Sequence, residues 1–327
     1  MQHRRPRYVE KYMIKRYRNL APTKKPSFRD FWHLARTPRK AWKYIENVKQ
    51  YPPPPERVNG SDLRVTMVNH MTLLIQTMGL NILTDPIWSK RCSPVQWAGP
   101  KRYRPPGVKF TDLPPIDIIL LSHDHYDHMD KTSLIRLHKA FQPTIITGKG
   151  NTKHLSKWKI NTGIELDWWE KHNWSSDIHF TATPAQHFSG RTLWDRNKTL
   201  WIGLWIHTPH GDIYFAGDTG MGPHFEKIRT RLGVPRLSLI PIGAFQPRWF
   251  MSPVHLDPEE AWTTHKILHS QNSVATHYGT FALAMDEQNE PEEKIKILRH
   301  QEPQVKFWVL DYGEGRDIVL EESPISK

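Results

Sequence analysis

A chain of 327 residues is long enough to bury a large core, and its 14 Trp, 12 Phe and 10 Tyr exclude an intrinsically disordered protein. No run of about 18 apolar residues occurs, which excludes a membrane-spanning helix, and no apolar segment follows the basic first residues, so a secretory signal is not expected. The single cysteine, Cys92, excludes an intramolecular disulfide and fits a reducing compartment, so we expect a cytoplasmic protein.

The net charge of +13 is concentrated in the first 50 residues. They contain 15 Lys and Arg against three acidic residues, whereas the rest of the chain contains 31 basic and 30 acidic residues. Aromatic residues such as Tyr8, Tyr12, Trp32 and Trp42 lie between the basic ones, a mixture typical of a helix on an anionic membrane surface. Packing against the body of the same chain stays open as a second interpretation. Nucleic acid is a third partner, which this pattern does not favour.

Four consecutive prolines at 52–55 predict a stiff linker after this basic arm. We therefore divide the chain into the arm with its linker, residues 1–56, and a folded domain, residues 57–327. The arm is expected to be helical and to associate peripherally with a membrane.

Strands and helices mix along the whole of the second part. Alternating apolar residues predict paired strands at 63–68 and 72–77. The nearly continuous apolar run 116–122 predicts a strand buried on both faces, followed by a helix at 131–141 with Asp130 as its N-cap. Further strands are predicted at 80–83, 144–147, 178–183, 200–207, 212–216, 237–241, 273–277 and 306–310, and further helices at 258–268 and 291–299. This mixture predicts an α/β body in which sheets pack together beneath outer helices.

The strongest chemical signal is a cluster of ligand-type residues just after the buried strand. His123, His125, Asp127 and His128 fall within six residues. In extended chain His123 and His125 point to the same side, and the turn into the helix brings the other two round to a neighbouring position. One pair would hold one metal ion and the other pair a second. Imidazole and carboxylate ligands suit zinc, with manganese and iron left open.

So short a cluster cannot complete two sites, so partners are expected at other strand ends. His187, Asp218 and His277 each lie at the carboxyl end of an apolar run, where α/β folds gather their active sites. Gly217 and Gly220 permit the tight turn that would bring the Asp218 carboxylate between two cations.

This pattern of His-x-His-x-Asp-His, a lone His, an Asp in a Gly-Asp-Thr turn and a final His resembles the metallo-β-lactamase superfamily. More narrowly, several stretches resemble the phospholipase D family that hydrolyses N-acylphosphatidylethanolamine. The clearest is Pro-Ile-Gly-Ala-Phe-Gln-Pro-Arg-Trp-Phe-Met at 241–251. The others are 83–88, 99–102, 113–117, 165–170, 215–220, 255–260 and 279–283. The resemblance extends from about residue 64 to residue 314, and implies an αββα sandwich beyond the basic arm.

The resemblance also implies two Zn²⁺ ions per chain, with a water or hydroxide between them. Their ligands would be three histidines for one ion, two histidines and an aspartate for the other, and a bridging aspartate: His123, His125 and His187; His128, His277 and Asp127; and Asp218. Asp85 would orient a ligand histidine, although a turn or capping role is its alternative.

Further residues are implied to act on the substrate. Asp127, Asp218 and His255 would take part in catalysis, and His255, with Arg191 and Phe245, would contact the substrate. Phe245 stands where mammalian members of the family carry Tyr, and Asn69-His70 where they carry Gly-His. These departures remove no ligand, but they leave the acyl chain and headgroup of the substrate undetermined.

The function that follows is hydrolysis of N-acylphosphatidylethanolamine to an N-acylethanolamine and phosphatidic acid. A phospholipid substrate gives the basic arm, residues 1–50, a reason to bind an anionic membrane surface. A lactonase or a nuclease on the same metal site is the alternative, and a metal-dependent binding protein without activity is a more distant one. A homodimer is compatible with the sequence.

Overall fold

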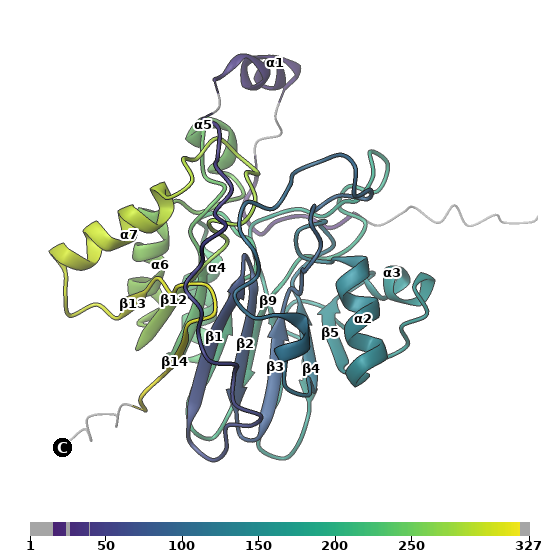
Figure 1. Ribbon diagram of the computed structural model, residues 1–327, viewed down its shortest axis with the longest axis vertical. Helices are drawn as coiled ribbons and strands as arrows, with labels where there is room; N and C mark the ends of the chain where they lie inside the picture. The colour runs from purple at the N-terminus through teal and green to yellow at the C-terminus, as the bar shows by residue number, and fades with distance from the viewer. Residues whose placement is uncertain (1–15, 24–26, 39, 321–327) are drawn as a thin grey trace, which may run out of the picture.

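Two seven-stranded mixed sheets form the centre of the computed structural model, which describes residues 16–23, 27–38 and 40–320 (Figure 1). In spatial order the first sheet contains β14 (Gly315–Asp317), β1 (Leu63–Asn69), β2 (Thr72–Thr77), β3 (Leu80–Thr84), β4 (Ile118–Leu121), β5 (Thr144–Gly148) and β6 (Gly163–Leu166). The second contains β13 (Phe307–Trp308), β12 (Asn272–Thr276), β11 (Pro235–Pro241), β10 (Asp212–Phe215), β9 (Gly203–His207), β8 (His179–Thr183) and β7 (Lys171–Asn173).

Helices cover the outer face of each sheet (Figure 1). The first sheet carries α2 (Lys131–Phe141) and α3 (Thr152–Lys157), and the second carries α4 (His224–Leu232), α6 (Pro258–Leu268) and α7 (Glu290–Gln301). Shorter elements are α1 (Phe28–Arg36), α5 (Arg248–Met251) and the 3₁₀ turn η1 (Phe110–Asp112). This order of layers confirms the predicted αββα sandwich. Within the described ranges, no helix combines the length and the apolar character needed to cross a bilayer.

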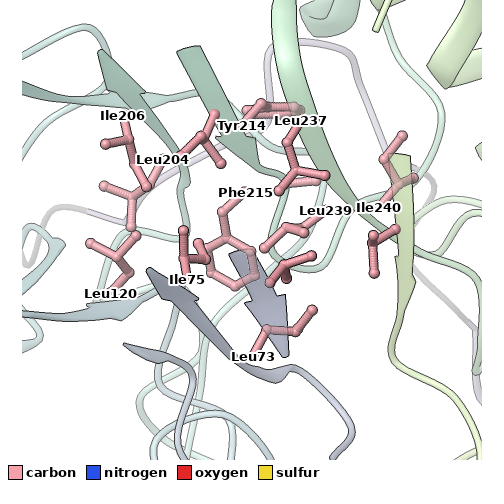
Figure 2. Packing of buried hydrophobic residues seen from close by; sticks show 14 of the residues in the cluster. Leu73, Ile75, Leu120, Leu204, Ile206, Tyr214, Phe215, Leu237, Leu239 and Ile240 are labelled. Carbon is pink, nitrogen blue, oxygen red and sulfur yellow. The ribbon is translucent and has the colours of Figure 1, made fainter. Parts of the chain in front are cut away.

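The main core lies between the two sheets (Figure 2). Leu73 and Ile75 of β2 face Phe215 of β10, and all three side chains are fully buried. Strand β4 contributes to both of its faces, because Leu120 packs between the sheets whereas Leu121 packs towards the outer helices. The prediction of a strand buried on both sides at this position is therefore confirmed.

Strand directions bring several carboxyl ends to the same edge of the sandwich. Strands β3, β4 and β5 are parallel to one another, as are β10, β11 and β12. Strand β8 is antiparallel to β9, which is antiparallel to β10, so β8 and β10 also end on the same side. Loops that follow these strands therefore meet, as expected for the functional edge of an α/β fold.

The described part of the N-terminal region packs on the body of the chain, which was the second of the interpretations left open. Helix α1 begins at the N-cap Ser27 and has nine residues, so the described part of the expected helical arm is helical over a short stretch. After it, the Ile45 N–H donates to the Tyr103 carbonyl at 2.8 Å, and the Trp42 indole N–H donates to the Asp286 carbonyl at 3.0 Å. Residues 1–15, which contain five of the 15 Lys and Arg of the first 50 residues, lie outside the described residues.

Candidate metal centre

Seven ligand-type side chains from four separate segments converge at this edge. The segments are the turn after β4 and the residues that follow β8, β10 and β12, with the residue after β3 supporting them. All seven are buried or nearly so: His123, His125, Asp127, His128, His187, Asp218 and His277. The structure thus brings together every residue that the sequence nominated as a metal ligand.

Three histidines form the first group. Nδ1 of His125 lies 2.8 Å from Nε2 of His123 and 3.2 Å from Nε2 of His187. Ligand atoms around a tetrahedral zinc ion are separated by roughly 3.3 Å, because each Zn–N distance is about 2.0–2.1 Å. Three ring nitrogens that meet at this spacing can hold one divalent ion.

The second group combines two histidines with a carboxylate. Oδ2 of Asp127 lies 3.0 Å from Nε2 of His128 and 3.4 Å from Nε2 of His277. His70, in the turn between β1 and β2, adds a third imidazole, whose Nε2 is 3.0 Å from the same oxygen. Burial lowers the pKa of His70 to about 3, so its ring is neutral and can donate one N–H to Asp127.

Asp218 lies between the two groups. Its Oδ2 is 3.2 Å from Nε2 of His128, 3.3 Å from Nε2 of His277 and 3.7 Å from Nε2 of His187. Burial acts to raise the pKa of Asp218, but His128 and His277 hold it well below its usual range. The side chain is therefore an anion at a position where it can contact ions on both sides.

The turn before Asp218 requires glycine, as the sequence predicted. Gly217 has φ of 62°, and a Cβ there would lie 2.7 Å from Cβ of Ser122 and 2.9 Å from the carbonyl oxygen of Ile202. No larger residue fits between β4 and β9 at this point. Asp85 and His277 also have left-handed backbone, with φ of 29° and 62°. Such conformations persist where the surroundings enforce them, which is common at functional sites.

Several buried polar atoms of the site form no hydrogen bond with any of the described residues. They include Nε2 of His128, Nε2 of His277 and Oδ1 of Asp218. Buried polar groups without partners are costly, and a cation at the centre of each group would satisfy them. The imidazole and carboxylate donors are the ligand types of zinc and related divalent ions. The residues present therefore fit two metal ions.

Hydrogen bonds from the far side of the imidazoles set their orientation. Oδ2 of Asp85 accepts from Nδ1 of His128 at 2.7 Å and from the Ser122 hydroxyl at 2.6 Å. The Val254 carbonyl accepts from Nδ1 of His187 at 2.9 Å. In a neutral ring, each arrangement places the single proton on Nδ1, so that Nε2, which faces the site, can bind a metal ion. Asp85 therefore lies where the sequence expected it.

Two side chains shape the ligand loop in ways that the sequence did not predict. Asp124 accepts from the Gly190 N–H at 2.7 Å and from the Thr199 hydroxyl at 2.8 Å. Burial acts to raise the pKa of Asp124, but these hydrogen bonds and His154 hold it at about 2. Arg191 donates from Nη1 to the carbonyls of Asp124 and Met129, at 2.7 and 2.9 Å.

Two of the residues predicted to contact the substrate have partners within the chain. Nη1 of Arg191 donates to the backbone of the ligand loop, and the guanidinium carbon lies 3.9 Å from the centre of the Tyr126 ring. The Phe245 ring is fully buried, with the Lys294 ammonium 5.2 Å from its centre.

His255, which the sequence predicted to contact the substrate, lies beside Asp218. Its Nδ1 is 4.0 Å from Oδ2 of Asp218 and forms no hydrogen bond with the described residues. Burial lowers the pKa of His255 to about 4, so the ring is neutral near pH 7 and can donate one N–H. A donor beside the Asp218 carboxylate could contact an anionic oxygen of a ligand bound there.

Comparison with known proteins agrees with this geometry. Residues 80–278 match the model of the Beta-lactamase superfamily domain. N-acyl-phosphatidylethanolamine-hydrolyzing phospholipase D 1 of Caenorhabditis elegans is 38% identical over 277 residues, which cover 78% of this chain and 75% of the relative. The mitochondrial N-acyl-phosphatidylethanolamine-hydrolyzing phospholipase D of Saccharomyces cerevisiae is 38% identical over 228 residues, 67% of this chain and 48% of that protein.

Solved structures share the fold. Igni18, a metallo hydrolase from Ignicoccus hospitalis KIN4/I, superimposes with a TM-score of 0.61 at 21% identity and covers 80% of this chain and all of its own. An isothiocyanate hydrolase from Delia radicum gut bacteria has the same TM-score at 22% identity, covering 77% of this chain and 98% of its own. The family, the fold and the side-chain clusters together indicate a metal-dependent hydrolase. The chain belongs to the beta-lactamase superfamily and, within it, to the family of N-acylphosphatidylethanolamine-hydrolysing phospholipases D.

Proposed function

We propose that this protein is a zinc-dependent phosphodiesterase that hydrolyses N-acylphosphatidylethanolamine to an N-acylethanolamine and phosphatidic acid. The observation that carries the proposal is the pair of ligand groups that share Asp218, in a chain 38% identical to a phospholipase D of this type. Two such groups suit displacement at phosphorus, because cations on both sides can neutralise the attacking and the leaving oxygens.

The side chains of this site would have two roles, binding of the metal ions and contact with the substrate. His123, His125 and His187 would hold one ion, and Asp127, His128 and His277 the other, with Asp218 contacting both. When bound, two zinc ions supply Lewis acidity and lower the pKa of water to about 7, which gives a nucleophile at neutral pH. The His255 N–H would donate to a phosphoryl oxygen and stabilise the charge that grows there in the transition state. Burial raises the pKa of the Cys92 thiol, which makes it an unsuitable nucleophile.

Removal of metal tests the proposal. Treatment with a chelator is expected to abolish hydrolysis of N-acylphosphatidylethanolamine vesicles, and two equivalents of Zn²⁺ per chain are expected to restore it. The products would be identified by mass spectrometry, with a mixed phospholipid extract and single-stranded DNA as competing substrates. Full activity without metal would contradict the metal centre. Cleavage of the DNA in place of the lipid would identify the protein as a nuclease and not as a phospholipase.

Exposed apolar side chains near the site support contact with a membrane. Leu193 and Trp194 are 93% and 79% exposed, and they lie on the loop that begins at the ligand His187. Trp32 of α1 is 52% exposed, with the Arg36 guanidinium 3.5 Å from the centre of its ring. Figure 1 shows α1 above α5 at one end of the molecule. Tryptophan and cationic side chains together are typical of a surface that binds anionic lipid.

Replacing both Leu193 and Trp194 with Ala is expected to weaken binding to anionic vesicles about fivefold or more, because roughly 0.8 kcal/mol is lost for each CH₂ group no longer buried in lipid. Hydrolysis of substrate dispersed in detergent is expected to stay at the wild-type rate. Vesicle co-sedimentation measures the first effect. Ile297→Ala, at a 57% exposed position on α7, is the matched control. Equal vesicle binding by the double variant and the wild type would show that these side chains do not contribute to membrane binding.

A further inference from the structure

The N-terminal segment that precedes α1 is attached to the loop that begins at His187. The Tyr17 N–H donates to the Asn197 carbonyl at 2.8 Å, and the Asn197 amide donates back to the Tyr17 carbonyl at 3.4 Å. Arg16 donates to the carbonyl of Arg196. These contacts join positions about 180 residues apart and hold the far end of the loop 187–197.

At the near end of this loop, one side chain of the N-terminal segment pairs with the backbone of a predicted metal ligand. Nδ2 of Asn19 donates to the His187 carbonyl at 2.9 Å, and Oδ1 of Asn19 accepts from the His187 N–H at 3.1 Å. The indole N–H of Trp201 donates to the same Oδ1 at 2.9 Å and thereby fixes which way the amide faces. The Asn19 amide therefore pairs with both the N–H and the carbonyl of His187, as the backbone of a neighbouring strand would.

His187 depends on this contact because it lies at a strand end and is 1% exposed. Strand β8 ends at Thr183, so the ladder that holds the strand does not extend to His187. Its ring is fixed at Nδ1 by the Val254 carbonyl, and its backbone is fixed by Asn19. Two fixed points define the direction of Nε2, the atom that faces His125. Without Asn19, a buried N–H and a buried carbonyl would lose their partners, and the backbone would shift to recover them.

We propose that Asn19 is a positioning residue of the metal centre, and that the N-terminal segment is thereby a part of the site. Asn19 holds the backbone of His187 so that the three-histidine group keeps the spacing that a metal ion needs. This inference rests on the proposed metal centre but not on the proposed substrate. It predicts that the two metal-binding steps respond differently to a change at residue 19, because Asn19 contacts the first ligand group and not the second.

The test compares metal binding by full-length Asn19→Ala, Asn19→Asp and wild-type protein. Asn19→Ala is expected to weaken one of the two binding steps roughly tenfold, the lower end of the range for residues that support a ligand. Asn19→Asp preserves the side-chain volume but places an oxygen against the His187 carbonyl, so the same step is expected to weaken. Competition with a chromophoric chelator measures the affinities, and the visible spectrum of the Co²⁺-loaded protein reports the ligand geometry. Asn173→Ala, at an exposed position in β7, is the control.

Metal affinity is measured without lipid, so failure to hydrolyse a phospholipid would leave this inference standing. Circular dichroism of the metal-free proteins checks that each variant is folded. Wild-type affinity and an unchanged Co²⁺ spectrum in both Asn19 variants would overturn the inference. So would an equal weakening of both steps together with a loss of folded protein, because that result would indicate general destabilisation. A wild-type chain that binds no divalent metal would overturn it together with the metal centre.

Discussion

Replacing Asp218 with Asn is expected to lower kcat/KM by about 10³-fold or more, because roughly 4 kcal/mol of stabilisation of the transition state would be lost with the shared anion. The carboxylate is within reach of both ligand groups, at 3.2 Å from His128 and 3.7 Å from His187. An amide has the same shape but neither the charge nor the second acceptor oxygen. Both ions would be held less tightly, and their separation would no longer be fixed by a common ligand.

Metal content by mass spectrometry and kcat/KM against N-acylphosphatidylethanolamine measure this effect. Fewer than two ions per chain are expected in Asp218→Asn under conditions that saturate the wild type. Asp177→Asn, at an exposed position before β8, makes the same chemical change away from the site and should leave both quantities unchanged. Normal activity of Asp218→Asn with two bound ions would refute the bridging role.

Local patterns determine how well the elements could be predicted. The predicted strand 72–77 and the predicted helices 131–141 and 258–268 have the observed bounds of β2, α2 and α6. The two helices begin after the N-cap residues Asp130 and Asp257, whose side chains accept hydrogen bonds from the first turn. Strands β6, β7 and β14 were missed because each has only three or four residues at or near a sheet edge, too few for a period to be recognised.

The ligands could be predicted because metal chemistry leaves a local signal. His123 to His128 form a dense cluster, and Asp218 stands in a glycine turn that few other functions need. His70 gives no such signal: it is a single histidine in a turn between strands, and only the fold brings it to Asp127. The same holds for Asn19, whose partner lies 168 residues away and is contacted through its backbone. A contact to backbone atoms does not depend on the residue type of the partner, so no sequence pattern reveals it.

Replacing His255 with Ala is expected to lower kcat by about 10²–10³-fold, the loss typical of removing one donor to a developing anion. The side chain approaches Asp218 with Nδ1 at 4.0 Å, yet that nitrogen has no hydrogen-bond partner in the part of the chain that the structure describes, and the residue is only 8% exposed. Distances within the three-histidine group and around Asp127 are shorter, at 2.8–3.4 Å, and Asp218 lies 3.2–3.7 Å from His128, His277 and His187. His255 is therefore farther from Asp218 than these three histidines are, and we expect it to contact the substrate rather than a metal ion.

These two roles predict opposite results for metal content. If His255 donates to the substrate, His255→Ala retains two ions per chain, and His255→Gln recovers part of kcat because the Gln amide can also donate. KM is expected to change less than kcat, because the donated hydrogen bond strengthens as charge grows on the phosphoryl oxygen in the transition state. His210→Ala, in the turn before β10 and away from the centre, is the control. Loss of one ion from His255→Ala would instead identify the residue as a metal ligand. A different donor would then have to stabilise the phosphoryl oxygen.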